Sequence, residues 1–123
     1  MDDISRGRLI NALESLQQEL IRWEKYNFPN TFNLEQFIGI VEEVGELAHY
    51  VLKSSQGIRE AIDKKGNKVS VKEKMEDAVG DIAIFLINYC SHVNIDFGEA
   101  LMRTWDEVKQ RDWRKYPIDG VSE

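Results

Sequence analysis

The sequence contains a single cysteine, two histidines and two prolines among its 123 residues. Cys90 alone cannot close an intramolecular disulfide, and together with two histidines it cannot supply a typical structural zinc site. We therefore expect a reduced, cytoplasmic protein that is stabilised by an apolar core instead of by disulfides or structural zinc. The chain length suits a single domain, residues 1–123, because it is too short for two ordinary cores.

Basic residues and long apolar runs are also scarce. The chain has 16 Lys and Arg against 22 Asp and Glu, for a net charge of -6 at pH 7, which argues against nucleic acid or an anionic membrane as the main partner. The longest apolar run, Ile82 to Ile87, is too short to span a membrane. The N-terminus lacks the basic and then apolar pattern of a signal peptide.

Between Pro29 and Pro117 the apolar residues recur at helical spacing, so we predict an all-α fold. A first helix is expected from about Ser5 to Lys25. Its apolar stripe steps by three or four residues and consists of Leu9, Leu13, Leu16, Leu20 and Trp23.

A second helix is expected to begin with Asn33 as its N-cap and to end near Ser54. Its inward residues are predicted to be Phe37, Ile40, Val44, Leu47 and Val51. The following segment, Lys53 to Lys74, is polar, contains Gly57 and Gly66, and has a surplus of basic residues. We interpret it as a mobile, positive connector that would close as a lid over phosphates.

The third helix, from about Val71 to Val93, is apolar on every side between Ile82 and Ile87. Such a helix is expected to be buried all round. Because a small bundle buries a central helix most readily with helices of another copy, we predict a homodimer or homotetramer. A fourth helix, opened by Asn94 or Asp96 and continuing to Val108, completes a four-helix-bundle-like fold.

Acidic residues gather at unusual positions on the second helix. Glu46 is a neighbour of both Glu43 and Glu42, because residues three and four apart share a face of a helix. Glu43 lies three residues after Ile40 and four before Leu47, which places a carboxylate at the edge of the apolar stripe. That position is unfavourable unless a cation compensates the charge.

The third helix has a similar arrangement. Asp77 and Asp81 are four residues apart, and Asn88 follows two turns after Asp81 on the same face. Two antiparallel helices of this kind would bring several carboxylates together, and hard oxygen ligands suit Mg²⁺, for which Mn²⁺ can substitute.

Three other interpretations remain open. Glu-rich helices are commonly solvated surfaces, and the chain could be a metal-binding or structural helical module without turnover. Glu46 and His49 also have the Glu-x-x-His spacing of di-iron carboxylate bundles, but this motif occurs only once here.

Four stretches carry a resemblance to a known family: Trp23-x-x-x-Asn27-Phe28, Val41 to Ala48, Asp77 to Ile82 with Asn88, and Trp105 to Trp113. In their order and content they resemble the MazG-like family of all-α nucleotide pyrophosphohydrolases, which is related to dimeric dUTPases and phosphoribosyl-ATP pyrophosphohydrolase. The resemblance implies Mg²⁺-dependent hydrolysis of a nucleoside triphosphate to a monophosphate and pyrophosphate, with a possible role in sanitising the nucleotide pool.

The resemblance also implies roles for single residues. Glu43, Glu46 and Asp81 match the metal-binding positions, and Glu42 matches an additional glutamate that would act on the attacking water, as Glu43 also could. The sequence departs from the family pattern at Ala78, where a glutamate is expected. Asp77 would then replace that ligand with a shorter side chain.

The remaining candidates would bind the substrate. Lys53, Lys109 and Arg111 are predicted to hold phosphates, because charge-assisted hydrogen bonds to phosphate are strong. Trp23 would stack on the base, and the amide of Asn88 would bond the sugar or the base edge.

Overall fold

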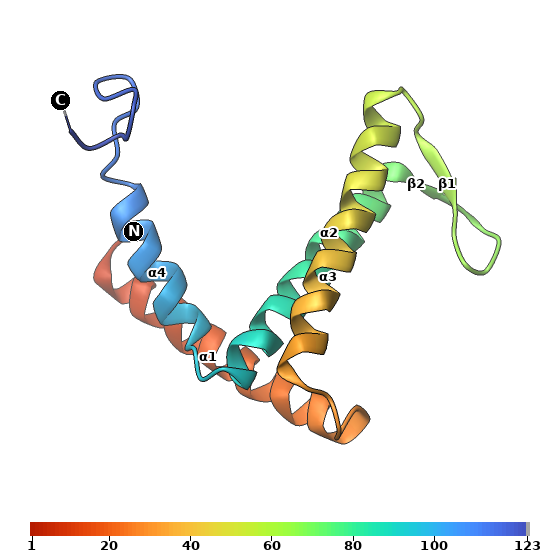
Figure 1. Ribbon diagram of the computed structural model, residues 1–123, viewed down its shortest axis with the longest axis horizontal. Helices are drawn as coiled ribbons and strands as arrows, with labels where there is room; N and C mark the ends of the chain where they lie inside the picture. The colour runs from red at the N-terminus through yellow and green to blue at the C-terminus, as the bar shows by residue number, and fades with distance from the viewer. Residues whose placement is uncertain (123) are drawn as a thin grey trace.

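The computed structural model describes residues 1–122, which form four α-helices and one small antiparallel sheet (Figure 1). The predicted all-α class is confirmed as a predominantly helical fold. The elements are α1 (Asp3–Asn27), α2 (Asn33–Ser55), β1 (Glu60–Ile62), β2 (Lys68–Ser70), α3 (Val71–His92) and α4 (Phe97–Val108).

Two helices begin at residues other than those predicted. The carboxylate of Asp2 accepts a hydrogen bond from the backbone N–H of Ser5 at 2.6 Å, so α1 begins at Asp3. Asn33 is not the N-cap of α2, because Phe32 occupies that position and no side chain caps the helix. An extended residue can therefore precede a helix without supplying the usual side-chain acceptor.

The start of α4 confirms one of the two predicted positions. Asp96 is the N-cap, and its carboxylate accepts from the backbone N–H of Glu99 at 3.0 Å. Asn94 instead lies in the connecting loop with a positive φ of 59°, a conformation that asparagine tolerates better than most residues.

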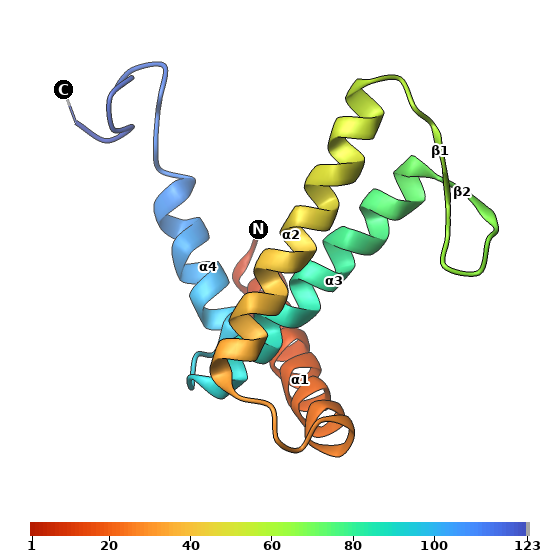
Figure 2. The ribbon, with the colours of Figure 1, turned by 45° about the vertical axis from the view of Figure 1, so that its right-hand side comes forward.

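The segment from Lys53 to Lys74 is more ordered than predicted. Within it, β1 pairs with β2 so that Ala61 lies opposite Val69, and Figure 2 shows this hairpin projecting beside α3. In the turn, the carboxylate of Asp63 accepts from the backbone N–H of Lys65 and of Asn67, both at 2.9 Å. Strands of three residues are too short to display an alternating pattern, so the spacing of apolar residues did not predict this hairpin.

The close packing of α2 against α3 organises one half of the molecule. A methyl group on Gly39 would collide with the ring of Phe85, so glycine is what allows the two helices to approach here. The helices are antiparallel, and Glu43 and Asp81 each lie four residues from this contact. They are therefore brought to the same level of the helix pair.

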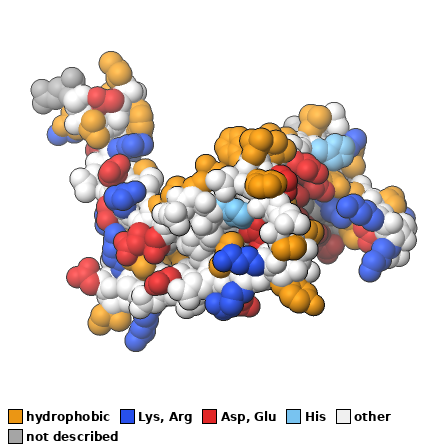
Figure 3. Space-filling model, turned by 60° about the horizontal axis from the view of Figure 1, so that its bottom comes forward, with side chains coloured by type: hydrophobic (Ala, Val, Ile, Leu, Met, Phe, Trp, Pro, Cys, Tyr) orange, Lys and Arg blue, Asp and Glu red, His pale blue; other side chains and the backbone are white. Residues whose placement is uncertain are grey.

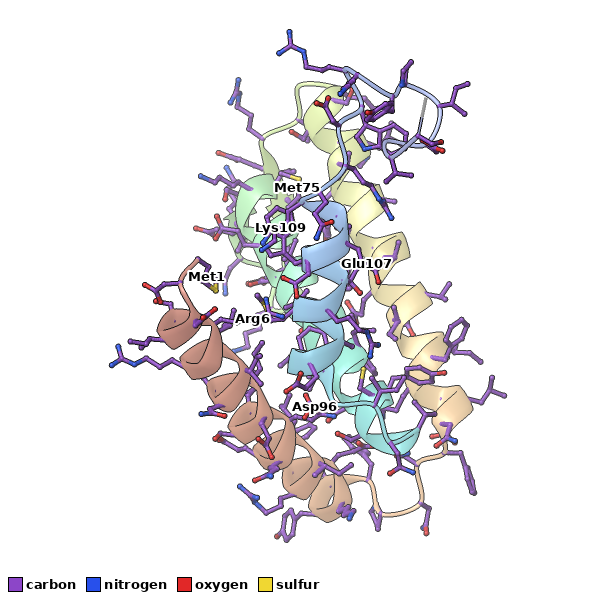
Figure 4. The ribbon with its side chains drawn as sticks, turned by 90° about the vertical axis from the view of Figure 1, so that its left-hand side faces the viewer. Met1, Arg6, Met75, Asp96, Glu107 and Lys109 are labelled. Atoms are coloured by element: carbon purple, nitrogen blue, oxygen red, sulfur yellow. The ribbon has the colours of Figure 1, made fainter. Side chains whose placement is uncertain are left out.

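The other half consists of α1 and α4, which form the second arm of a V (Figure 1). Arg6 points toward α4 (Figure 4), and its guanidinium donates two hydrogen bonds to the carboxylate of Asp106, at 2.8 and 2.6 Å. Gln17 donates to the carbonyl of Ile95 at 2.8 Å and accepts from the N–H of Phe97 at 3.0 Å. The α1 helix also contacts α3, which joins the two arms.

The predicted apolar stripes are displaced at two positions. Trp23 has an exposed fraction of 54%, whereas its neighbour Glu24 is only 2% exposed. On α2, Phe37 is 50% exposed, whereas Gln36 is 6% exposed. In both cases the polar residue is buried and the adjacent aromatic residue is exposed. This is the reverse of what the usual burial of aromatic side chains predicts.

The prediction that α3 is buried all round is wrong for a single chain. Val79, Ile84 and Leu86 are exposed, because the V shape leaves no helix to cover this side of the α2–α3 pair. Figure 3 shows hydrophobic side chains gathered on the side of the molecule where α2 and α3 lie, with acidic side chains beside them.

Within residues 1–122, no single helix is long and apolar enough to span a membrane. Taken together, α3 and α4 are long and apolar enough, but the two helices meet at an angle of 109°.

Candidate functional site

Glu43 is the centre of an acidic cluster between α2 and α3. Its Oε2 atom is buried and has no hydrogen-bond partner in the structure. Burial raises the pKa of its carboxyl most, followed by the negative charge of Asp81, the charge and a hydrogen bond of Glu46, and the charge of Glu42. Glu42, Glu46 and Asp81 therefore lie near enough to Glu43 for their charges to act on its carboxyl, and none of the groups that act on it is positively charged.

The cluster is open to solvent around this buried oxygen. Glu42, Glu46 and Asp81 are exposed residues, whereas Glu43 is half-buried. A cation can therefore reach Glu43 from the side of the more exposed carboxylates. A hard divalent ion would relieve the repulsion and supply the partner that the Glu43 oxygen lacks.

Asp77 and Ala78 differ in their environments. Asp77 is exposed and is not among the groups that act on the carboxyl of Glu43. Ala78 is only 1% exposed and packs in the interior, one helical turn before Asp81. The position at which the family pattern expects a carboxylate thus belongs to the core in this chain, and the structure does not bring Asp77 into the cluster.

In the arrangement that the structure shows for residues 1–122, no three His, Cys, Asp or Glu side chains converge closely enough to hold a metal ion. The metal-binding roles of Glu43, Glu46, Asp77 and Asp81 therefore stay predictions. The uncompensated carboxyl of Glu43 is the observation in their favour.

A cavity of about 390 Å³ adjoins the cluster at the junction of α1, α2 and α3. Asp81 belongs to both the cluster and the cavity wall, so the two features are continuous. The other lining residues are aromatic, apolar or polar: Trp23, Glu24, Phe28, Thr31, Glu35, Gln36, Ile84, Phe85 and Asn88. A cavity of this size is typical of a binding site for a small organic ligand.

Three of the lining residues form a buried polar wall: Glu24, Gln36 and Asn88. The Nε2 atom of Gln36 donates to Oε1 of Glu24 at 2.9 Å, and Nε2 of His92 lies 2.6 Å from the same oxygen. One oxygen on each of Glu24, Gln36 and Asn88 remains buried without a partner. Buried acceptors are normally hydrogen-bonded in proteins, so a ligand or a water molecule in the cavity could satisfy these oxygens.

Two aromatic residues complete the outer wall of the cavity. Trp23 meets Phe28 edge to face, with 5.9 Å between ring centroids, and about half of each side chain remains exposed. Flat apolar surface beside buried polar atoms suits a planar heterocycle, which needs stacking on its face and hydrogen bonds at its edge.

The predicted substrate-binding residues are divided between different places. Trp23 and Asn88 both line the cavity. Lys53 lies ten residues beyond Glu43, about 15 Å further along the axis of α2. At the end of α4, the Nζ atom of Lys109 lies 3.4 Å from Oδ1 of Asp106, and Arg111 follows two residues later in the chain. Within one chain these cations are not gathered at the cluster.

Sequence reasoning missed Glu24, Gln36 and His92. The available signal was the same one that identified Glu43: Glu24 is four residues after Leu20, which places a carboxylate on the apolar stripe of α1. The contact with His92 has no sequence signal, because the two residues are 68 positions apart and meet only through tertiary packing.

The di-iron interpretation requires His49 to join the acidic cluster, and the structure does not show this. His49 is exposed, and its ring lies against Tyr50 with 5.0 Å between centroids.

Comparison with known proteins returned no match: no family model fits the chain, and neither a curated protein nor a solved structure is significantly similar to it.

The raised pKa of Glu43 leads to a prediction about stability. A carboxyl whose pKa is higher in the folded state binds its proton more tightly there, so folding is opposed as pH rises through that pKa. At pH 7 without metal, Glu43→Gln should therefore raise the free energy of unfolding by up to about 1 kcal/mol, the range of partly screened charges. The gain should vanish below pH 4. Urea unfolding at both pH values measures it, and a loss of stability at pH 7 would contradict the account.

Proposed function

We propose that this chain is a Mg²⁺-dependent nucleotide pyrophosphohydrolase, which converts a nucleoside triphosphate into a nucleoside monophosphate and pyrophosphate. One observation carries the proposal: Asp81 joins a cluster of uncompensated carboxylates to a cavity with aromatic and buried polar walls. A nucleotide has the matching two parts, a metal-binding phosphate chain and a planar base. The sequence resemblance to MazG-like enzymes points to the same reaction.

The carboxylates of the cluster would bind the metal ion that contacts the phosphate chain. Glu43, Glu46 and Asp81 would hold the metal, with Asp77 reaching toward it only by reorientation of its exposed side chain. Bound Mg²⁺ would neutralise charge on the phosphate oxygens and lower the pKa of a coordinated water. The buried Oε2 atom of Glu43 has no hydrogen-bond partner, and a cation bound among these carboxylates would supply one.

The chain's own residues would position the reactants. Glu42 is an exposed carboxylate of the cluster, and it would accept a proton from the water that attacks the α phosphorus. The bond from that phosphorus to the bridging oxygen would break, and pyrophosphate would leave. Trp23 and Asn88 would hold the nucleoside in the cavity, which fixes the distance between the base and the reacting phosphate.

The phosphate chain also needs cations beyond the metal. Lys53, Lys109 and Arg111 remain the proposed contacts, and the last two would reach the cluster from another copy of the chain. The basic hairpin between α2 and α3 would act as a lid.

The reaction predicts release of pyrophosphate, and not orthophosphate, from a panel of ordinary and modified nucleoside triphosphates. Release should require Mg²⁺, with Mn²⁺ as a substitute, and should stop in EDTA. Glu46→Ala should lower turnover by at least about 100-fold, because it removes a proposed metal-binding carboxylate.

The matched control is Glu19→Ala, which removes an exposed carboxylate of α1 outside the cavity and cluster. It should leave turnover unchanged. Equal turnover by Glu46→Ala and the parent protein would contradict the proposal.

We also propose that the chain forms a homodimer or homotetramer through α2 and α3. The exposed face of α3 contains Val79, Ala83 and Leu86 at helical spacing. Exposed apolar residues continue along α2: Leu34, Ile38, Val41, Val44, Val51 and Leu52. Contiguous apolar surface of this extent is unusual on a monomer.

Analytical ultracentrifugation should therefore give a mass of at least two chains. Leu86→Lys should shift the protein toward the monomer, because it would bury a charge at the interface. Asn67→Lys, in the turn of the hairpin, adds the same charge elsewhere and should leave the mass unchanged. A monomeric parent protein would refute the oligomer.

A second candidate function is a structural helical module without turnover. It is favoured by the burial of Ala78 in place of a carboxylate and by the absence of a closed three-ligand group within residues 1–122. Under that function, Glu46→Ala would change neither metal-dependent turnover nor nucleotide binding, since neither would exist.

A further inference from the structure

The polar wall of the cavity presents hydrogen-bond acceptors. Oε2 of Glu24 and Oε1 of Gln36 are both buried and without partners, and the side chains that carry them are more than nine-tenths buried. Both residues line the cavity. A carboxylate oxygen can only accept a hydrogen bond, so a group that binds beside it must donate one.

The orientation of the Gln36 amide is determined by its neighbour. Its Nε2 atom donates to Oε1 of Glu24 at 2.9 Å. The reverse orientation would place an amide oxygen against a carboxylate oxygen, which is repulsive. The amide oxygen is therefore the free end, and it adds a second acceptor to the wall.

His92 holds the carboxylate from the other side. Its Nε2 lies 2.6 Å from Oε1 of Glu24, so this oxygen already has two partners, whereas Oε2 has none. Asn88 adds a further unpaired oxygen, Oδ1. An asparagine amide can present either end, so only Glu24 and Gln36 have a fixed acceptor that faces the cavity.

We infer that the cavity selects nucleobases that carry an amino group, as cytosine, adenine and guanine do, over bases that present a carbonyl in its place, such as uracil and hypoxanthine. An amino group brings donors to the free acceptors. A carbonyl in the same place would set its lone pairs against those of Glu24 and Gln36, and only the single ring N–H of uracil or hypoxanthine would be left to donate to the two buried acceptors. The inference rests on the proposed nucleotide-binding function and specifies its substrate class.

The test compares pairs of nucleotides that differ at this group. Binding of dCMP against dUMP, and of dAMP against dIMP, is measured by calorimetry in EDTA, so the result does not depend on metal or turnover. The amino-bearing member of each pair should bind at least about tenfold more tightly, because its amino group donates a buried hydrogen bond to the carboxylate of Glu24 that the carbonyl of the other member cannot make.

Two variants examine the wall itself. Glu24→Gln keeps the size of the side chain and supplies an amide donor, so the preference should fall to less than about threefold or reverse. Gln36→Met removes the second acceptor and should weaken the preference without changing the charge of Glu24. Glu19→Gln, on the exposed side of the same helix, should leave it unchanged. Circular dichroism and thermal unfolding verify that each variant is folded.

The outcomes separate this inference from the proposed function. Equal binding within both pairs, or preference for the carbonyl-bearing base, overturns the inference even if pyrophosphate is released from every triphosphate. Selective binding that Glu24→Gln abolishes supports it even if no triphosphate is hydrolysed. Absence of binding by all four nucleotides overturns it as well.

Discussion

The approach of α2 to α3 at Gly39 and Phe85 is the contact on which the rest of the arrangement depends. Because the helices are antiparallel, this contact places Glu43 level with Asp81. On α3, Phe85 and Asn88 follow Asp81 and line the cavity together with residues of α1. The same contact therefore gathers the carboxylates and shapes the adjoining cavity. A side chain larger than hydrogen at position 39 would separate these groups, because close-packed helices transmit such displacements.

The helix pair carries two kinds of unpaired polar group at an energetic cost. The carboxyl of Glu43 is desolvated among like charges, and the cavity holds acceptor oxygens without donors. Neither feature stabilises the isolated chain. Sites of this kind are expected where a ligand supplies the missing charge or hydrogen bonds, and here the two lie at opposite ends of one continuous surface that includes Asp81.

The sequence was sufficient for the features that depend on local periodicity. Helical spacing predicted four helices, and it placed Glu43 and Asp81 on two packed helices, where the charge of Asp81 raises the pKa of the Glu43 carboxyl. Features that depend on a choice between adjacent residues were not predictable: Glu24 lies inside in place of Trp23, and Gln36 in place of Phe37. The buried position of Glu24 goes with tertiary contacts to Gln36 and His92, which no periodicity encodes.

We propose that Glu43 belongs to a cation site. The most direct measurement is the binding of Mn²⁺, followed by the electron paramagnetic resonance signal of the free ion, to the parent protein and to Glu43→Gln. We expect saturable binding that Mg²⁺ displaces and that Glu43→Gln weakens at least about tenfold, whereas Glu19→Gln should bind Mn²⁺ as the parent protein does. Equal Mn²⁺ affinity of the parent protein and Glu43→Gln, or no saturable binding to either, would contradict it.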